Sequence, residues 1–348
     1  MQKTIEIAGN SIKPGSRQSI DIPLPSFYTH SSVNMPVHVV HGRQPGPTLL
    51  VSAAVHGDEI NGVEIIRRLL AHKSVNRIKG TLIAIPVVNV YGFVSKSRYL
   101  PDRRDLNRSF PGSETGSMAA RLANVLMTEI LPHCDHIIDL HTGAVYRENL
   151  PQIRARLRED PALENLARAF GVPVILNAEL LEGSFREAAH NLGIDVLLYE
   201  AGEALRFDEV AIRAGVQGIL QVMAALGMRS KSRRKQRVES MIANRSRWVR
   251  AGQSGILRSL IATGMKVEEG DLLGYINDPL GEHTEELASP VSGIVIGKTN
   301  LPLVFAGEAL FNVAGYDEID QVAENIDAYN DQLNPETDVR LTDEPPLV

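Results

Sequence analysis

The sequence predicts an α/β protein with a mixed, mainly parallel sheet, helices on both faces of that sheet, and a small all-β unit at the carboxyl end. Two observations support this prediction. Short apolar runs typical of buried strands alternate with segments of helical spacing up to residue 226. Beyond residue 247, short apolar segments are separated by closely spaced glycines. A chain of 348 residues is long enough for two such units.

The strands and helices expected in the first unit follow one another along the chain. After short strands and turns in residues 1–45, the apolar stretch 48–55 has the composition of a strand buried on both faces. The segment 63–71 has helical spacing, and Ser184 followed by Glu187 forms a capping-box pattern that begins another helix. The other expected strands are 37–40, 81–88, 136–140, 172–176 and 194–199, and the other expected helices are 117–131, 161–170 and 207–226.

The composition changes after Gly227, where a new part of the chain is expected to begin. We expect a first domain over 1–228 with an N-terminal β segment, a linker over 229–247, and a C-terminal β domain over 248–348. The tail from residue 317 is acidic and contains prolines, and its end is expected to be mobile. A basic run in the linker has no aromatic or glycine-rich element beside it, so it is interpreted as solvated. This run consists of Arg229, Lys231, Arg233, Arg234, Lys235 and Arg237.

The overall composition excludes several classes of protein. Hydrophobic residues make up 43% and charged residues 22% of the chain, as in an ordinary globular protein. A net charge of −6 gives no electrostatic reason to expect nucleic acid or an anionic membrane as a partner. With Cys134 as its single cysteine, the chain forms no internal disulfide. Neither a signal peptide nor an apolar run of about 20 residues is evident, so we expect a cytoplasmic protein.

Two short motifs at the ends of expected strands offer metal ligands. His56 and Glu59 follow the strand 48–55, and a turn entering a helix brings side chains three residues apart to one face. His141 follows the strand 136–140 in the same way, and ligands bind at this edge of open α/β sheets. Two histidines and one glutamate leave a fourth position for water, which is typical of a catalytic zinc site. The sequence therefore predicts one Zn²⁺ per chain, held by these three residues.

Two further features accompany the predicted zinc site. Asp139, two residues before His141, is interpreted either as the acceptor for a ligand's second ring nitrogen or as a structural residue. The loop 97–112 is rich in turn residues, and a guanidinium can bind a carboxylate with two parallel hydrogen bonds. This loop is therefore either an anion site or a surface loop with internal salt bridges. Its arginines are Arg98, Arg103, Arg104 and Arg108.

Three motifs, in this order, resemble those of the succinylglutamate desuccinylase/aspartoacylase family. They are His-Gly-Asp-Glu at 56–59, Asp-Leu-Asn-Arg at 105–108 and Asp-Leu-His-Thr-Gly at 139–143. The resemblance covers about residues 35–315. It implies a zinc carboxypeptidase-like fold with the zinc ligands named above. It also implies a deacylase that cleaves the amide bond of an N-acyl amino acid or of a related small carboxylate-bearing amide.

The resemblance also implies roles for residues of the arginine-rich loop. Asn107 and Arg108 would bind the free carboxylate of a small-molecule substrate. An arginine earlier in the loop would polarise the scissile carbonyl. Arg98 matches that arginine best because Arg-Tyr precedes the Asp-Leu-Asn-Arg motif in relatives. The loop is about two residues longer than in some relatives, so Arg103 and Arg104 stay open as alternatives.

A glutamate at the end of a late strand completes the implied catalytic set. Glu200 follows the strand 194–199 and matches the family's catalytic glutamate in position. A carboxylate beside a zinc-bound water can take its proton and later give it to the leaving amine. Glu200 is therefore expected to be the general base and acid.

The C-terminal unit resembles the biotinyl/lipoyl carrier fold in its glycine pattern at 264–270 and 289–293. Carrier domains attach their cofactor to a lysine at a hairpin tip, and the expected tip, 278–283, has none. We therefore expect this unit to pack against or cap the active site rather than to carry a swinging arm.

Two alternatives to a deacylase are open at this point. The same motifs permit a metallo-carboxypeptidase that acts on peptides, and also a metal-binding scaffold without catalytic activity. Substrate specificity is expected to depend on loops such as 144–156 and 183–186. The residues of these loops do not identify the acyl group or the amine of the substrate. A homo-oligomer is compatible with the sequence.

Overall fold

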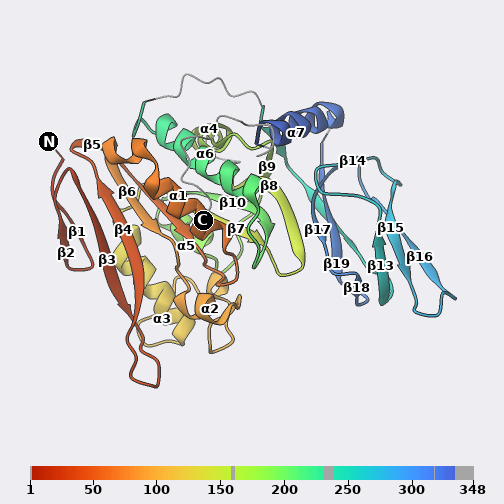
Figure 1. Ribbon diagram of the computed structural model, residues 1–348, viewed down its shortest axis with the longest axis horizontal. Helices are drawn as coiled ribbons and strands as arrows, with labels where there is room; N and C mark the ends of the chain where they lie inside the picture. The colour runs from red at the N-terminus through yellow and green to blue at the C-terminus, as the bar shows by residue number, and fades with distance from the viewer. Residues whose placement is uncertain (1, 158–160, 231–238, 317, 334–348) are drawn as a thin grey trace.

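The computed structural model describes residues 2–157, 161–230, 239–316 and 318–333. A long central sheet flanked by helices occupies most of the molecule, and a smaller β unit lies at one end of it (Figure 1). The architecture is mixed α/β with a mainly parallel centre, which confirms the fold class predicted from the sequence.

The strands and helices of the first part follow in chain order. They are β1 (Ile5–Ile7), β2 (Asn10–Ile12), β3 (Ser16–Leu24), β4 (Val33–His41), β5 (Gln44–Ala53), α1 (Asn61–Ala71), β6 (Lys79–Ile85), α2 (Val90–Ser95), α3 (Met118–Val125), β7 (His136–Gly143), β8 (Arg147–Ala155), α4 (Pro161–Phe170), β9 (Val174–Asn177), α5 (Phe185–Asn191), β10 (Asp195–Glu203), α6 (Glu209–Ala225) and β11 (Met241–Ala243). Within the described ranges, no helix combines the length and the apolar character that crossing a membrane requires.

The remaining elements form the C-terminal unit and a final helix. They are β12 (Ser246–Arg250), β13 (Gly255–Ser259), β14 (Lys266–Val267), β15 (Leu272–Asn277), β16 (Thr284–Ala288), β17 (Gly293–Thr299), β18 (Leu303–Val304), β19 (Ala309–Gly315) and α7 (Ile319–Leu333).

The parallel strands β5, β7 and β10 form the centre of the sheet and run in the same direction. Their register aligns Ser52 with Asp139, and His141 with Glu200. The carboxyl ends of these three strands therefore meet at one edge of the sheet, where α/β proteins bind their ligands.

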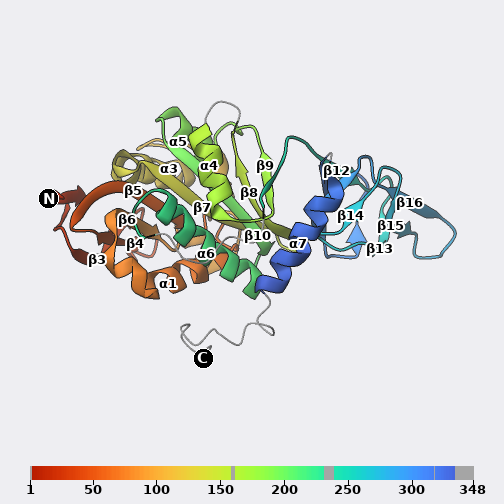
Figure 2. The same cartoon turned by 90° about the horizontal axis from the view of Figure 1, so that it is seen from above.

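Successive residues of β5 face two different hydrophobic cores, as the period of two in a strand requires. Leu49 and Val51 belong to a core shared with α1, α4 and α6, whereas Leu50 belongs to a core shared with α3 and α5. Figure 2 shows α1 and α6 on one side of the strands and α3 and α5 on the other. Burial on both faces over residues 48–53 fits the short apolar run expected at 48–55.

The C-terminal unit is a two-layered β structure joined to the central sheet. Strands β12, β19 and β17 continue that sheet because β17 pairs with β8, and β16, β15, β13 and β18 form the second layer. The core between the layers includes Leu257, Leu273 and Phe311. The hairpin tip between β15 and β16 falls at residues 278–283, as expected, and contains no lysine.

Strand β8 corrects the expectation of a loop over 144–156. Its first residues are charged or polar, which removes the apolar alternation that predicts a strand. They form ladder pairs on both sides nevertheless: Asn149 pairs with Gly202 of β10 and with Gly297 of β17. Short helix α2, which has only six residues, was not expected either.

The acidic C-terminal segment begins with a helix, α7, and residues 334–348 lie outside the described part of the chain. Its buried side chains recur at helical spacing: Val322, Ile326, Tyr329 and Leu333. Tyr329 and Leu333 join the core beneath α6, while Val322 and Ile326 pack among strands of both units. This helix therefore binds the C-terminal unit to the first one.

The expected linker also contains ordered structure in its described part. Strand β11 adds to the sheet by pairing in parallel with β9. Of the basic run, only Arg229 is described, and the other five residues lie outside the described ranges.

We predict that the apolar face of α7 stabilises the whole protein. Replacing Ile326 by Ala removes a buried side chain, so the free energy of unfolding should fall by about 2–5 kcal/mol. Chemical denaturation of both proteins measures the difference. The exposed neighbour Glu324, replaced by Ala, serves as the control and should change stability by less than about 0.5 kcal/mol. Equal stability of both variants would contradict the packing described for this helix.

Candidate active site

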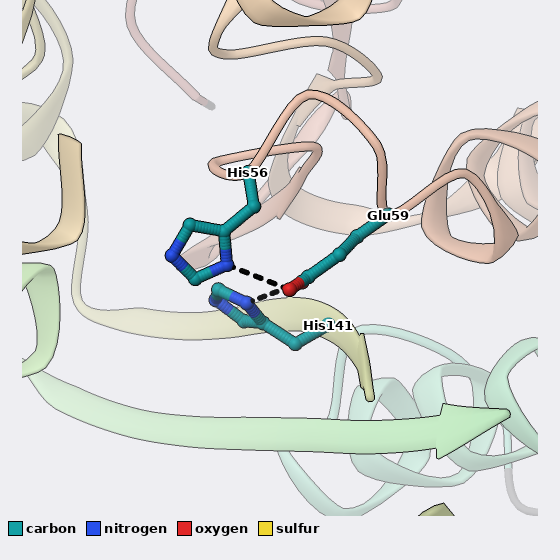
Figure 3. A group of neighbouring side chains, drawn as sticks. All are labelled: His56, Glu59 and His141. Atoms are coloured by element: carbon teal, nitrogen blue, oxygen red, sulfur yellow. Dashed lines mark hydrogen bonds and ion pairs between the residues drawn. The ribbon is translucent and has the colours of Figure 1, made fainter. Parts of the chain in front are cut away.

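Three buried side chains converge at the shared edge of β5, β7 and β10 (Figure 3). His56 and Glu59 lie in the turn between β5 and α1, and His141 lies in β7. Glu59 Oε1 is 2.7 Å from His56 Nδ1, and Glu59 Oε2 is 2.7 Å from His141 Nδ1. Their potential ligand atoms all lie within 4.8 Å of one another, so the group could hold a metal ion.

The turn that carries two of these residues requires glycine at position 57. A side chain there would place its Cβ 2.0 Å from the backbone carbonyl carbon of Gly92 in α2. Backbone atoms cannot move aside as the end of a flexible side chain can. The His-Gly-Asp-Glu motif therefore depends on close packing of α2 against the turn as well as on its ligand-type residues.

The hydrogen bonds of His141 test whether these residues fit a metal. His141 Nε2 lies 2.8 Å from Asp139 Oδ2, and an ionised carboxylate can only accept, so this nitrogen carries the proton. Its Nδ1 lies 2.7 Å from Glu59 Oε2, a contact that is satisfied either by a proton on Nδ1 or, when the ring is neutral, by a cation beside both atoms. Two imidazoles and one carboxylate around such a position match the donor set of a catalytic zinc site.

The pKa values of Glu59 and His141 are shifted in opposite directions by their charged neighbours. Burial would raise the pKa of Glu59, but the adjacent His56 and His141 outweigh burial and hold this pKa well below its usual range. Burial would lower the pKa of His141, and the carboxylates of Asp139 and Glu59 outweigh it and raise this pKa. The site is therefore built to combine a carboxylate anion with positive charge.

Arg98 is the arginine of the 97–112 loop that reaches the cluster. Its Nε and Nη2 lie 3.1 and 2.9 Å from Asp105 Oδ2, and its Nη1 lies 3.3 Å from His56 Nδ1. Arg103 and Arg104 are exposed and do not line the cavity beside the cluster. Of the three candidates from the sequence, only Arg98 is next to the predicted ligands.

Asn107 and Arg108 also line this cavity, and they lie in the short helical turn 106–108. Asp105 caps the turn because its side chain accepts a hydrogen bond from the Asn107 backbone N–H at 2.8 Å. Asn107 Oδ1 accepts from the backbone N–H of Phe185, at the start of α5, at 2.9 Å. The Asn107 amide is thus oriented by a second segment.

Glu200 lies in β10 directly beside His141 and lines the same cavity. Its Oε2 accepts a hydrogen bond from Asn149 Nδ2 at 2.7 Å and lies 3.2 Å from Arg154 Nη2. Both partners belong to β8, which was expected to be a loop. The predicted metal, catalytic and substrate-binding residues therefore all line one cavity, whereas Arg103 and Arg104 do not, and Asp139 contacts His141 without lining it.

The cavity has a volume of about 240 Å³, and part of its wall was not predicted. Trp248 of β12 brings the C-terminal unit to the cavity, and the Arg147 guanidinium lies 5.9 Å from the centre of its ring. Burial, together with the charge of Arg154, lowers the pKa of Arg186 to about 10. Around the cavity, the described lining contains five arginines and two glutamates. These are Arg98, Arg108, Arg147, Arg154, Arg186, Glu59 and Glu200.

The excess of arginines over glutamates in the cavity lining favours an anionic ligand. No local motif distinguishes the arginines of β8 and α5 from surface arginines, so sequence reasoning had no signal for them. The Ser-Phe-Arg-Glu segment at 184–187 gave a helix cap but no binding role.

Solved structures of other proteins share this fold over most of both chains. The product-bound ectoine utilization protein EutE (DoeB) from Ruegeria pomeroyi is 26% identical, with a TM-score of 0.79 over 86% of this chain and 95% of that one. A succinylglutamate desuccinylase/aspartoacylase from Rhodobacter sphaeroides is 29% identical, with a TM-score of 0.79 over 87% and 96%.

The amino-acid sequence gives matching results. The N-alpha-acetyl-L-2,4-diaminobutyric acid deacetylase of Halomonas elongata is 27% identical over 258 residues, which are 71% of this chain and 75% of the relative. The model of the succinylglutamate desuccinylase/aspartoacylase catalytic domain matches residues 45–226, just over half of the 348 residues. That range contains the buried His56, Glu59 and His141 cluster, and the chain belongs to the succinylglutamate desuccinylase/aspartoacylase family.

Proposed function

We propose that the protein is a zinc-dependent deacylase that hydrolyses the amide bond of an N-acyl amino acid or of a related small carboxylate-bearing amide. The observation that supports this most is the buried cluster of His56, Glu59 and His141 beside a cavity rich in arginines. Family membership supports the reaction class. The donor set of two imidazoles and a carboxylate supports one zinc ion per chain.

In this proposal, each residue around the cluster has a separate role in hydrolysis of the amide. Bound there, zinc would supply a Lewis acid and a water of lowered pKa. Glu200 takes the proton of the attacking water and returns it to the leaving amine nitrogen. The Arg98 guanidinium stabilises the negative charge that develops on the scissile carbonyl oxygen. Asp139 holds the ring of His141 in one orientation.

Substrate binding depends on groups on the other walls of the cavity. Asn107 and Arg108 hold the free carboxylate of the substrate, since a guanidinium pairs with a carboxylate through two hydrogen bonds. The cavity of about 240 Å³ is smaller than the roughly 300–1,000 Å³ of common ligand pockets, which favours a small amide over a peptide. The metallo-carboxypeptidase alternative is therefore less well supported.

Several expectations from the sequence stay predictions within this proposal. They are the division into a catalytic domain at 1–228, a linker at 229–247 and a β domain at 248–348, a homo-oligomeric assembly and a cytoplasmic location.

Purified protein should contain about one zinc ion per chain and should lose activity on chelation. A His141→Ala variant should retain little zinc, because two ligands hold the ion far more weakly than three. Elemental analysis by mass spectrometry measures the metal. The exposed His283, replaced by Ala, is the control and should leave zinc content unchanged. Full zinc occupancy in the His141→Ala protein would rule out the proposed ligand set.

A Glu200→Gln variant should lower kcat by about 10²–10⁴-fold because the amide cannot take a proton from water. KM should change little, since the groups proposed to bind the carboxylate remain. Steady-state kinetics measures both constants. Glu203→Gln, three residues further along β10 and outside the cavity lining, should keep near wild-type rates. A Glu200→Gln protein as active as the wild type would refute the assigned base.

N-acetyl and N-succinyl amino acids should be hydrolysed faster than dipeptides. Replacing the free carboxylate of a substrate by a carboxamide should raise KM by about 10- to 100-fold, because hydrogen bonds to charged groups contribute about 1.5–3 kcal/mol. An activity screen of the zinc-loaded protein tests both points. Faster turnover of dipeptides would favour a carboxypeptidase, and a zinc-loaded protein without turnover on the whole panel would favour a binding scaffold.

A further inference from the structure

Two side chains of the neighbouring strand β8 approach the carboxylate of Glu200. Among the described residues, Asn149 Nδ2 and Arg154 Nη2 both approach Oε2, at 2.7 and 3.2 Å. Both donors come from β8, the strand next to β10 in the sheet. These donors hold the Glu200 carboxylate at Oε2 while its side chain lines the cavity.

Asn149 occupies its position because of a glycine in the C-terminal unit. It is the ladder partner of Gly297 in β17, the strand through which that unit continues the central sheet. A Cβ at position 297 would lie 2.6 Å from Asn149 Oδ1, which is closer than such atoms approach. The amide that binds Glu200 therefore fills the space left by the missing side chain of Gly297.

We propose that Asn149 and Arg154 are positioning residues for Glu200, and that Gly297 of the C-terminal unit fixes the orientation of Asn149. The proposal rests on the proton-transfer role given to Glu200 under the proposed function. Proton transfer requires the carboxylate oxygen to lie within about 2.6–3.2 Å of its partner. A displacement of about 1 Å can lower the rate by about 10²-fold. The C-terminal unit thus affects catalysis in two ways: Gly297 orients the Asn149 side chain, and Trp248 forms part of the cavity wall.

Gly297→Ala tests this with little harm to the fold. The atom nearest to the new methyl group is the end of the Asn149 side chain, and the next, the Glu148 carbonyl oxygen, is 3.3 Å away. The amide must therefore move, while the backbone can stay nearly in place. We expect kcat to fall by about 10- to 100-fold and KM to stay within about twofold, because Asn107 and Arg108 are untouched.

A double-mutant cycle distinguishes an effect of Gly297 that is transmitted through Asn149 from a general disturbance of the sheet. Asn149→Ala should lower kcat as Gly297→Ala does. The double variant should be no slower than Asn149→Ala alone, because no amide is left to displace. Arg154→Lys, which keeps the charge, should retain more kcat than Arg154→Ala.

Gly252→Ala is the matched control. Its Cβ would lie 2.5 Å from Glu285 Oε1, again the end of a flexible side chain in the C-terminal unit, outside the cavity lining. This variant should keep wild-type kcat.

A second readout needs no metal and no turnover. Crystal structures of metal-free wild-type and Gly297→Ala proteins should differ in the contact between Asn149 and Glu200.

The outcomes separate this inference from the proposed function. If Glu200→Gln is inactive while Asn149→Ala and Gly297→Ala retain more than half of wild-type kcat, the positioning proposal is wrong and the base role stands. If Gly297→Ala lowers kcat equally in the wild-type and Asn149→Ala backgrounds, the glycine does not act through Asn149. If Glu200→Gln is fully active, the proposed function itself is refuted.

Discussion

The parallel register of β5, β7 and β10 is the constraint on which the site depends. Parallel strands bring their carboxyl ends to one edge of the sheet, so the residues that follow or end these strands meet there. His141 and Glu200 are direct ladder partners in β7 and β10, and the turn after β5 adds His56 and Glu59. The two hydrophobic cores on either face hold these strands in register, so the geometry of the cluster follows from the packing of the whole first unit.

The buried cluster has an energetic consequence for the fold. Glu59 and His141 are fully buried, and charged groups in such places are costly unless they are paired or bound to a metal. Asp139 and Asp105 supply pairing at the far sides of the two imidazoles, 2.8 and 3.2 Å from their Nε2 atoms. Because every charge in the group has a counter-charge beside it, the site can stay preorganised inside the protein.

The sequence was sufficient for the parts of the site that depend on local order. The residues predicted as metal ligands lie at strand ends within motifs of four or five residues, and strand, turn and helix alternate around them with clear periodicity. Arg98 also lies where the family resemblance places it, while the geometry leaves Arg103 and Arg104 outside the cavity. The apolar run 48–55 correctly predicted burial on both faces for residues 48–53 of β5.

The parts that the sequence could not predict depend on contacts between distant segments. Strand β8 begins with Arg147, Glu148 and Asn149, whose polarity suggests a loop, and its pairing with β10 and β17 is decided far away in the chain. Trp248 lines the cavity and Gly297 lies against Asn149, and both positions depend on the C-terminal unit continuing the central sheet. Helix α7 was predictable in principle, since its apolar residues recur every three or four positions within an acidic segment.

The most direct test of this account is anomalous diffraction at the zinc absorption edge from crystals of the zinc-loaded protein. The account predicts one strong anomalous peak about 2.0–2.2 Å from a nitrogen of His56, a nitrogen of His141 and an oxygen of Glu59. A fully occupied zinc peak elsewhere in the molecule, with none between these three side chains, would contradict it.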